Sequence, residues 1–105
     1  MLIIPLQAVP NQTATVILNG QVSQVNVYQE ISGLYLDLYV NNVLVIGGVI
    51  CENLNRIVRS AYLGFAGDLA FIDNEGSTDP VYTGLGGVGA RYSLAYLTPA
   101  EIGAA

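Results

Sequence analysis

Residues 34–41 read Leu-Tyr-Leu-Asp-Leu-Tyr-Val-Asn, an alternation of apolar and other side chains with a period of two. Successive side chains of a β-strand point to opposite faces, so this pattern predicts a strand with one buried face. The apolar face would carry Leu34, Leu36, Leu38 and Val40, and the opposite face Tyr35, Asp37, Tyr39 and Asn41. We assign the leucines to the core, where each burial contributes about 1.5 to 3 kcal/mol.

Tight turns are predicted on both sides of this strand. The β-branched run at residues 12–18 ends at Asn19-Gly20, which is a strong hairpin signal because a type I′ turn needs positive φ at both central positions. Residues 22–28 would form the return strand, with Val25 and Val27 on one face. On the other side, Asn41-Asn42 can form a second tight turn, since Asn tolerates the left-handed region. Residues 43–51 would then pair back.

The second half of the chain continues the pattern with more interruptions. Strands are expected at residues 56–65, 68–72 and 91–97, with loops at residues 73–80 and 84–89. Thr98-Pro99-Ala100-Glu101 resembles a capping box that could begin one short helical turn. We expect one all-β domain over residues 1–105, a small barrel or sandwich of about six to eight short antiparallel strands.

The composition indicates contact with other proteins. Hydrophobic residues make up 52% of the 105 residues and charged residues 10%, against roughly 25% charged in an ordinary soluble domain. These charged side chains are too few to cover the surface of a free monomer. We therefore expect part of the uncharged surface to contact another protein. The alternative is a monomer whose surface consists of Asn, Gln, Ser and Thr.

The charge balance argues against nucleic acid and membranes as partners. The chain has eight acidic residues, three arginines, and neither lysine nor histidine, whereas phosphate backbones and anionic lipids require clustered Lys and Arg. The longest apolar run, residues 43–51, is far shorter than the roughly 20 residues of a membrane-spanning helix. The first residues lack the pattern of a signal peptide, so we expect synthesis and assembly in the cytoplasm.

No catalytic or cofactor site is expected. Without histidine there is no conventional Ser-His or Cys-His pair, and Cys51 lies in an apolar run without a basic neighbour, which favours a structural role. Residues 84–89 match a dinucleotide fingerprint, but a strand pattern follows them where a helix would be needed. Asp73, Asn74, Glu75 and Asp79 lack the glycine spacing of a calcium loop, so a solvated turn is preferred and no metal is expected.

A pair of carboxylates is the remaining candidate for a catalytic site, because two carboxyl groups can perform acid-base chemistry on sugars. Asp37 and Asp68 each lie among apolar neighbours. We favour the alternative in which Asp37 faces solvent or a partner and Asp68 caps a turn after Gly67. The chain is therefore expected not to be an enzyme.

Several segments together resemble a known family. They are Arg-Ile-Val-Arg-Ser-Ala-Tyr-Leu-Gly-Phe-Ala-Gly-Asp-Leu-Ala-Phe-Ile-Asp at residues 56–73, Asp-Pro-Val-Tyr-Thr-Gly-Leu-Gly at residues 79–86, Leu-Ile-Ile-Pro-Leu-Gln at residues 2–7, and Gly-Leu-Tyr-Leu-Asp-Leu-Tyr at residues 33–39. The chain resembles the small baseplate plug proteins of contractile-tailed bacteriophages. The resemblance implies a structural subunit of the virion, in the central hub at the distal end of the tail, which helps close the channel. Its expected partners are hub, spike and tail tube proteins, and the expected assembled state is a trimer.

Tyrosine and arginine supply the candidate contact residues. Tyrosine combines a large contact area with one hydroxyl and is enriched at interfaces, and an arginine in an acidic chain often has a designated carboxylate partner, as we expect for Arg56 and Arg59. The predicted partner interface consists of Tyr35, Tyr39, Arg59, Tyr62 and Tyr82. We expect Arg59→Ala to weaken assembly more than folding. A second layer that buries both faces of the sheet is the alternative for the tyrosines.

A different class of function also fits these patterns. A small β binding module could recognise an extended peptide by adding it as a strand at an exposed sheet edge. Self-association separates the two hypotheses, because a plug should form a closed oligomer or none, whereas an edge-binding module should capture a peptide as a monomer.

Overall fold

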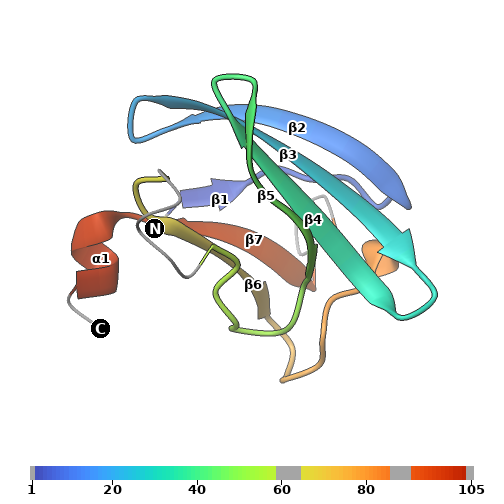
Figure 1. The fold of residues 1–105 in the computed structure, drawn as a ribbon. Coiled ribbons are helices and arrows are strands. Elements are labelled where there is room, and N and C mark those ends of the chain that lie inside the picture. The colour runs from blue at the N-terminus through green and yellow to red at the C-terminus, as the bar shows by residue number, and fades with distance from the viewer. Residues whose placement is uncertain (1, 59–64, 86–90, 104–105) are drawn as a thin grey trace.

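The computed structural model describes residues 2–58, 65–85 and 91–103. Within these ranges seven strands form two antiparallel sheets that pack as a sandwich (Figure 1). This architecture confirms the predicted all-β class and selects the sandwich over the barrel. None of the described helices is both long and apolar enough to cross a membrane.

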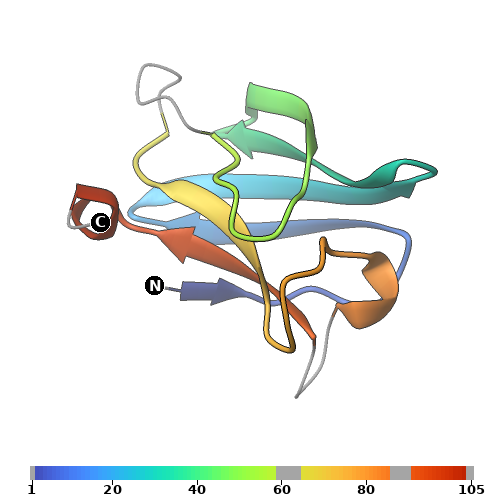
Figure 2. The ribbon, with the colours of Figure 1, turned by 90° about the horizontal axis from the view of Figure 1, so that it is seen from below.

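The larger sheet has four strands in sequential order. They are β2 (Asn11–Leu18), β3 (Gln21–Glu30), β4 (Gly33–Val40) and β5 (Val43–Ile50). The smaller sheet has the order β1-β7-β6, from β1 (Leu2–Ile4), β7 (Tyr92–Leu97) and β6 (Asp68–Asp73). A 3₁₀ turn, η2 (Tyr82–Gly84), and a short helix, α1 (Pro99–Gly103), lie at opposite ends of the sandwich (Figures 1 and 2).

Both predicted tight turns are present. The φ angles are 51° at Asn19 and 77° at Gly20, and 51° at Asn41 and 66° at Asn42. The flanking pairs are Leu18 with Gln21 and Val40 with Val43, so each loop has two residues. Positive φ at both positions defines type I′ turns, whose twist matches that of the strands they join.

One continuous core joins the two sheets. The core face of the larger sheet contributes Val25, Val27, Leu34, Leu36 and Leu38, and the smaller sheet contributes Leu69, Phe71, Leu94 and Tyr96, all nearly or completely buried. The Phe65 ring meets Tyr96 edge to face, with 5.7 Å between ring centroids. The assignment of the three leucines to the core is confirmed.

The strand predicted at residues 56–65 is wrong for the residues that can be judged. Arg56 makes a single bridge to Ala70, and Ile57 and Val58 are outside any strand. The Ile57 amide still donates to the Leu69 carbonyl of β6, but the Val58 amide donates to the Asp68 carboxylate, so regular pairing does not continue past Ile57. Residues 59–64 lie outside the described residues.

The first described residues form an additional strand, and the last described residues form the predicted helical turn. The strand β1 was not predicted, and it pairs with β7 through Leu2 and Tyr96, Ile3 and Ala95, and Ile4 and Leu94. The capping box at the start of α1 is confirmed: the Glu101 amide donates to Thr98 Oγ1 at 3.2 Å, and the Thr98 amide donates to Glu101 Oε1 at 3.0 Å. The helix begins at Pro99, as the sequence pattern predicts.

Candidate interaction face

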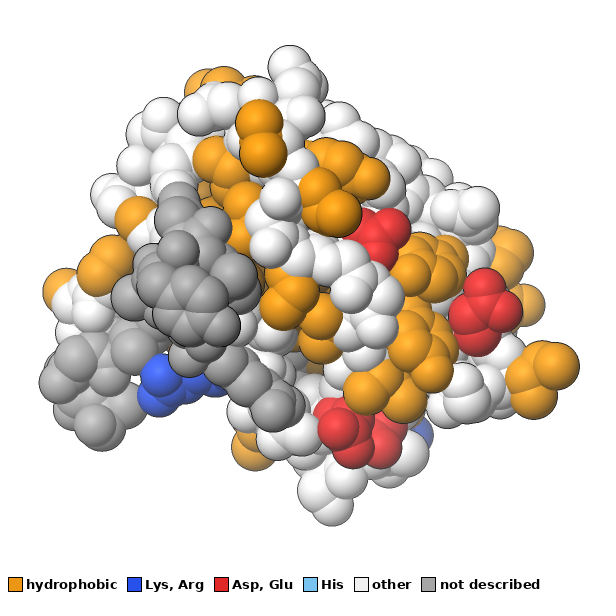
Figure 3. Space-filling view, in the orientation of Figure 1, with side chains coloured by type: hydrophobic (Ala, Val, Ile, Leu, Met, Phe, Trp, Pro, Cys, Tyr) orange, Lys and Arg blue, Asp and Glu red, His pale blue; other side chains and the backbone are white. Residues whose placement is uncertain are grey.

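The four-stranded sheet turns one face toward the core and the other away from it. We call the second surface the outer face, defined by Thr13, Thr15, Gln24, Asn26, Tyr28, Tyr35, Asp37 and Tyr39. Asp37 is the one ionisable acid or base among these residues other than the tyrosines. Figure 3 views the molecule from the side of β4 and β5, where hydrophobic and uncharged side chains surround a few separate acidic ones.

Two tyrosines of the outer face stack on neighbouring strands. Tyr28 of β3 lies opposite Tyr35 of β4, with ring centroids 6.0 Å apart and planes at 16°. The Tyr35 hydroxyl shares a 2.7 Å hydrogen bond with Ser32 Oγ. Partial burial and the hydrogen bond to Asp37 raise the pKa of Tyr28. The pair forms a semi-rigid aromatic surface that costs little side-chain entropy to bury further.

Asp37 is held at the centre of the face by an irregularity in β5. Its Oδ1 accepts hydrogen bonds from the Gly48 amide at 2.7 Å and from the Tyr28 hydroxyl at 3.1 Å. The pairing of β4 with β5 shifts register on both sides of Leu38, and Gly48 has a φ of 65°. A bulge with glycine in the left-handed region re-aims the backbone amide, here toward the carboxylate. Asp37 thus lies on the face expected to meet solvent or a partner.

Exposed apolar side chains extend the outer face at both ends. Ile17, 67% exposed, lies opposite Val22, and Leu44 lies opposite Tyr39. At the other end Ile50 lies opposite Tyr35, and Ile31 at the β3–β4 turn is fully exposed. The sequence prediction missed these residues, although the alternation at residues 12–18 already places Ile17 opposite to Val16 and Leu18.

The predicted interface residues are distributed over different parts of the molecule. Tyr35 and Tyr39 share the outer face, joined by Tyr28, which the prediction missed although Val25 and Val27 place it there by alternation. Tyr82 belongs to η2, where it is half-buried against the core and its amide donates to Gln29 Oε1 at 3.1 Å. Arg59 and Tyr62 lie outside the described residues.

The acidic loop after β6 is organised by an ion pair with Arg91, an arginine that the sequence analysis did not single out. Arg91 Nε and Nη2 bind the two Asp73 oxygens at 3.0 Å each, and the Glu75 and Thr78 amides donate to the same carboxylate. The guanidinium holds the pKa of Asp73 well below its usual range. The expectation of a solvated turn is therefore wrong for Asp73, which is buried, and right for Asn74, Glu75 and Asp79.

Asp68 does more than cap a turn. Its buried Oδ1 accepts from the amides of Ile57 at 3.1 Å and of Val58 and Leu69 at 2.7 Å each, so it fixes the segment before β6 to the smaller sheet. Asp37 and Asp68 lie in different sheets. Asp37 accepts a hydrogen bond from the Gly48 amide of β5, whereas Asp68 accepts from amides beside β6. They do not form the paired site that acid-base chemistry would require.

The remaining candidate for chemistry is a buried thiol. Cys51 is almost fully buried in the core, and burial raises its pKa to about 12. The reactive thiolate is therefore scarce at neutral pH, in agreement with a structural role. No group of three or more metal-ligating side chains occurs among the described residues.

These features define a β-sandwich protein whose distinctive surface is an aromatic sheet face with one carboxylate at its centre, the kind of surface that proteins bury against one another. The chain belongs to a phage family described as cyanophage baseplate Pam3 plug gp18, whose model matches residues 1–99. This confirms the resemblance seen in the sequence. The family is a structural one and not an enzyme family, so the protein is a baseplate component of the virion tail whose partners are other baseplate proteins. No curated protein matches the chain.

Proposed function

We propose that the chain acts as a plug subunit in the central hub, at the distal end of a contractile tail, and helps close the tail channel. It contacts hub, spike and tail tube proteins, forms a trimer in the assembled baseplate, and is assembled in the host cytoplasm as a single domain. Cyclic symmetry is the common arrangement of such assemblies. Membership of the plug family supports the position, and the outer face supports the contacts.

The outer face is the observation that carries this proposal. Its centre holds tyrosine, threonine and amide side chains and one carboxylate that is already hydrogen-bonded to Gly48 and Tyr28. Burying such a surface leaves few unpaired charges, and unpaired charges are the main cost of burial. Tyr35 and Tyr39 stay predicted interface residues on this face, and Arg59, Tyr62 and Tyr82 stay predictions for contacts elsewhere.

The net charge fits a position beside the DNA channel. With eight acidic residues against three arginines, the formal net charge is −5. Acidic side chains that face a channel repel the phosphate backbone and so do not retain the genome as it passes.

Labelling of virions tests the position directly. Antibody-gold labelling of intact and contracted virions, combined with quantitative mass spectrometry, should show label confined to the distal end of the tail in a copy number divisible by three. Absence of the protein from purified virions would discard the plug function and favour the binding module.

A charge placed on the outer face tests the contacts. Thr15 is exposed at the centre of β2, and its side chain makes no hydrogen bond within the described residues. We therefore expect Thr15→Glu to fold normally and to lower incorporation into baseplates. The matched control is Ser77→Glu in the exposed loop after β6, which adds the same charge away from the face. Equal incorporation of both variants would contradict the assignment of the outer face.

The edge of β2 favours a second candidate function. Among the described residues no strand pairs with the free side of β2, which carries no charged residue and keeps an unbroken register with β3 from Asn11 to Leu18. Uncharged, regular edges accept added strands. A binding module for an extended peptide would use this edge, and sedimentation across a concentration series would then show a monomer that captures peptide.

A further inference from the structure

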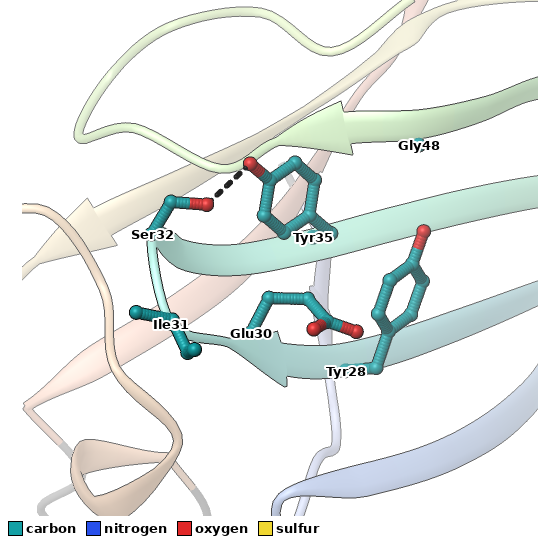
Figure 4. Close-up of a pocket in the computed structure, with 6 residues that line it drawn as sticks. All are labelled: Tyr28, Glu30, Ile31, Ser32, Tyr35 and Gly48. Carbon is teal, nitrogen blue, oxygen red and sulfur yellow. Dashed lines mark hydrogen bonds between the residues drawn. The ribbon is translucent and has the colours of Figure 1, made fainter.

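A shallow hollow lies between the tip of the β3–β4 hairpin and the bulge in β5. It has a volume of about 420 Å³ and is lined by Tyr28, Glu30, Ile31, Ser32, Tyr35 and Gly48. Figure 4 shows the two tyrosine rings standing on the same side of the sheet, with the Glu30 side chain alongside Tyr28. The hollow is therefore a preformed site on the outer face.

The walls of the hollow are suited to a cation. The faces of tyrosine rings carry partial negative charge and attract ammonium and guanidinium groups. The Glu30 carboxylate lies at the rim, and the Asp37 carboxylate lies behind the Tyr28 hydroxyl that donates to it at 3.1 Å. Within the described residues the structure shows no arginine paired with Glu30, and the chain has no lysine to fill the site itself.

One rim residue favours a cation on a long apolar stem. Ile31 is fully exposed at a hairpin turn, a position where Gly, Asn, Asp and Ser are the usual residues. The methylene groups of an arginine or lysine side chain commonly cover apolar surface while the charged end reaches a polar partner. Ile31 lies where such a stem would enter the hollow.

We propose that this hollow binds an arginine side chain of a partner baseplate protein. A planar guanidinium can stack on Tyr35 while it binds the Glu30 carboxylate through two N–H groups, and a lysine ammonium cannot do both. Its stem would pack on Ile31. The proposal deepens the proposed function, on which it rests for the identity of the partner, by naming the side chain that the outer face recognises.

A small probe tests the hollow without the virion. The probe is N-acetyl-arginine methylamide, titrated into the isotope-labelled protein and followed by amide chemical shifts, with the uncharged analogue N-acetyl-citrulline methylamide as comparison. We expect shifts centred on Ser32 and Gly48, and affinity about tenfold weaker for citrulline, because citrulline lacks the positive charge that the ring face and the carboxylate attract.

Variants separate the hollow from general attraction by a negative protein. Glu30→Gln should weaken arginine binding by about threefold to tenfold, whereas Glu75→Gln, which removes an exposed carboxylate of the loop after β6, should leave it unchanged. Equal binding of arginine and citrulline, equal effects of the two variants, or shifts centred elsewhere would overturn the inference. None of these outcomes affects the result of the labelling of virions, so the plug function is tested independently of the hollow.

Discussion

Replacement of Asp68 by alanine should destabilise the protein more than most single changes outside the hydrophobic core. Asp68 is only 3% exposed and accepts hydrogen bonds from three backbone amides. The substitution leaves the amides of Val58 and Leu69 without this acceptor, whereas the Ile57 amide still donates to the Leu69 carbonyl at 2.9 Å. A buried amide left without an acceptor costs about 1 to 3 kcal/mol, so the amides of Val58 and Leu69 together cost about 2 to 6 kcal/mol.

Two effects reduce this sum. Removing the carboxylate also removes the cost of burying its charge, and water can reach some of the freed amides. We therefore expect Asp68→Ala to lower the free energy of unfolding by about 2 to 4 kcal/mol. A chain of this length has about 5 to 15 kcal/mol in total, so much of its stability would be lost.

Urea denaturation measures this change, followed by far-ultraviolet circular dichroism and by tyrosine fluorescence, since the chain has seven tyrosines and no tryptophan. The matched control is Asp79→Ala, because the exposed Asp79 accepts one amide, that of Asn53 at 3.0 Å, and should cost less than about 1.5 kcal/mol. Equal losses for the two variants would refute the reasoning that the buried acceptor of three amides matters more than an exposed acceptor of one.

Three further predictions concern the core, the thiol and the ion pair. Leu36→Ala, at a fully buried site, should lower the free energy of unfolding by about 2 to 5 kcal/mol in urea, and Leu36→Met by less than about 1.5 kcal/mol. Cys51, whose pKa burial raises to about 12, should not react with a disulfide reagent at pH 8 until urea unfolds the protein; rapid reaction of the native state would contradict its burial. Arg91 lowers the pKa of Asp73 from 3.8, so this carboxylate stabilises the fold above that pH and its contribution is lost as the pH falls further. The urea midpoint of the native protein should therefore drop more steeply below pH 4 than that of Asp73→Asn, and parallel profiles would count against the pair.

Local signals account for the parts of the fold that were predicted from the sequence. The turns at Asn19-Gly20 and Asn41-Asn42 each act within one hairpin, so together with the alternation at residues 34–41 they determine the pairs β2–β3 and β4–β5 without reference to the rest of the chain. The same alternation placed Tyr35 and Tyr39 on the outer face. The family resemblance added the phage baseplate, which no residue pattern by itself implies.

Features that depend on distant residues were missed. The strand β1 is too short to show an alternation, and its partner β7 is about 90 residues away in the sequence. The replacement of the strand at Arg56–Val58 by an irregular segment depends on Asp68, and the ion pair of Arg91 with Asp73 joins two loops. The hollow beside Tyr35 needs the bulge that brings Gly48 to Asp37, a register shift that the glycines alone do not specify.

The two outer strands of the four-stranded sheet, β2 and β5, differ in the regularity of their pairing. The β2 edge is regular, whereas the β5 strand is interrupted by register shifts on both sides of Leu38. An endless fibre of such sheets would need a regular edge on both sides of every molecule, because each must pair upstream and downstream at once. Among the described strands of this sheet only β2 offers a regular edge, so pairing through it ends after a single partner. An open β2 edge therefore does not by itself lead to polymerisation through this sheet.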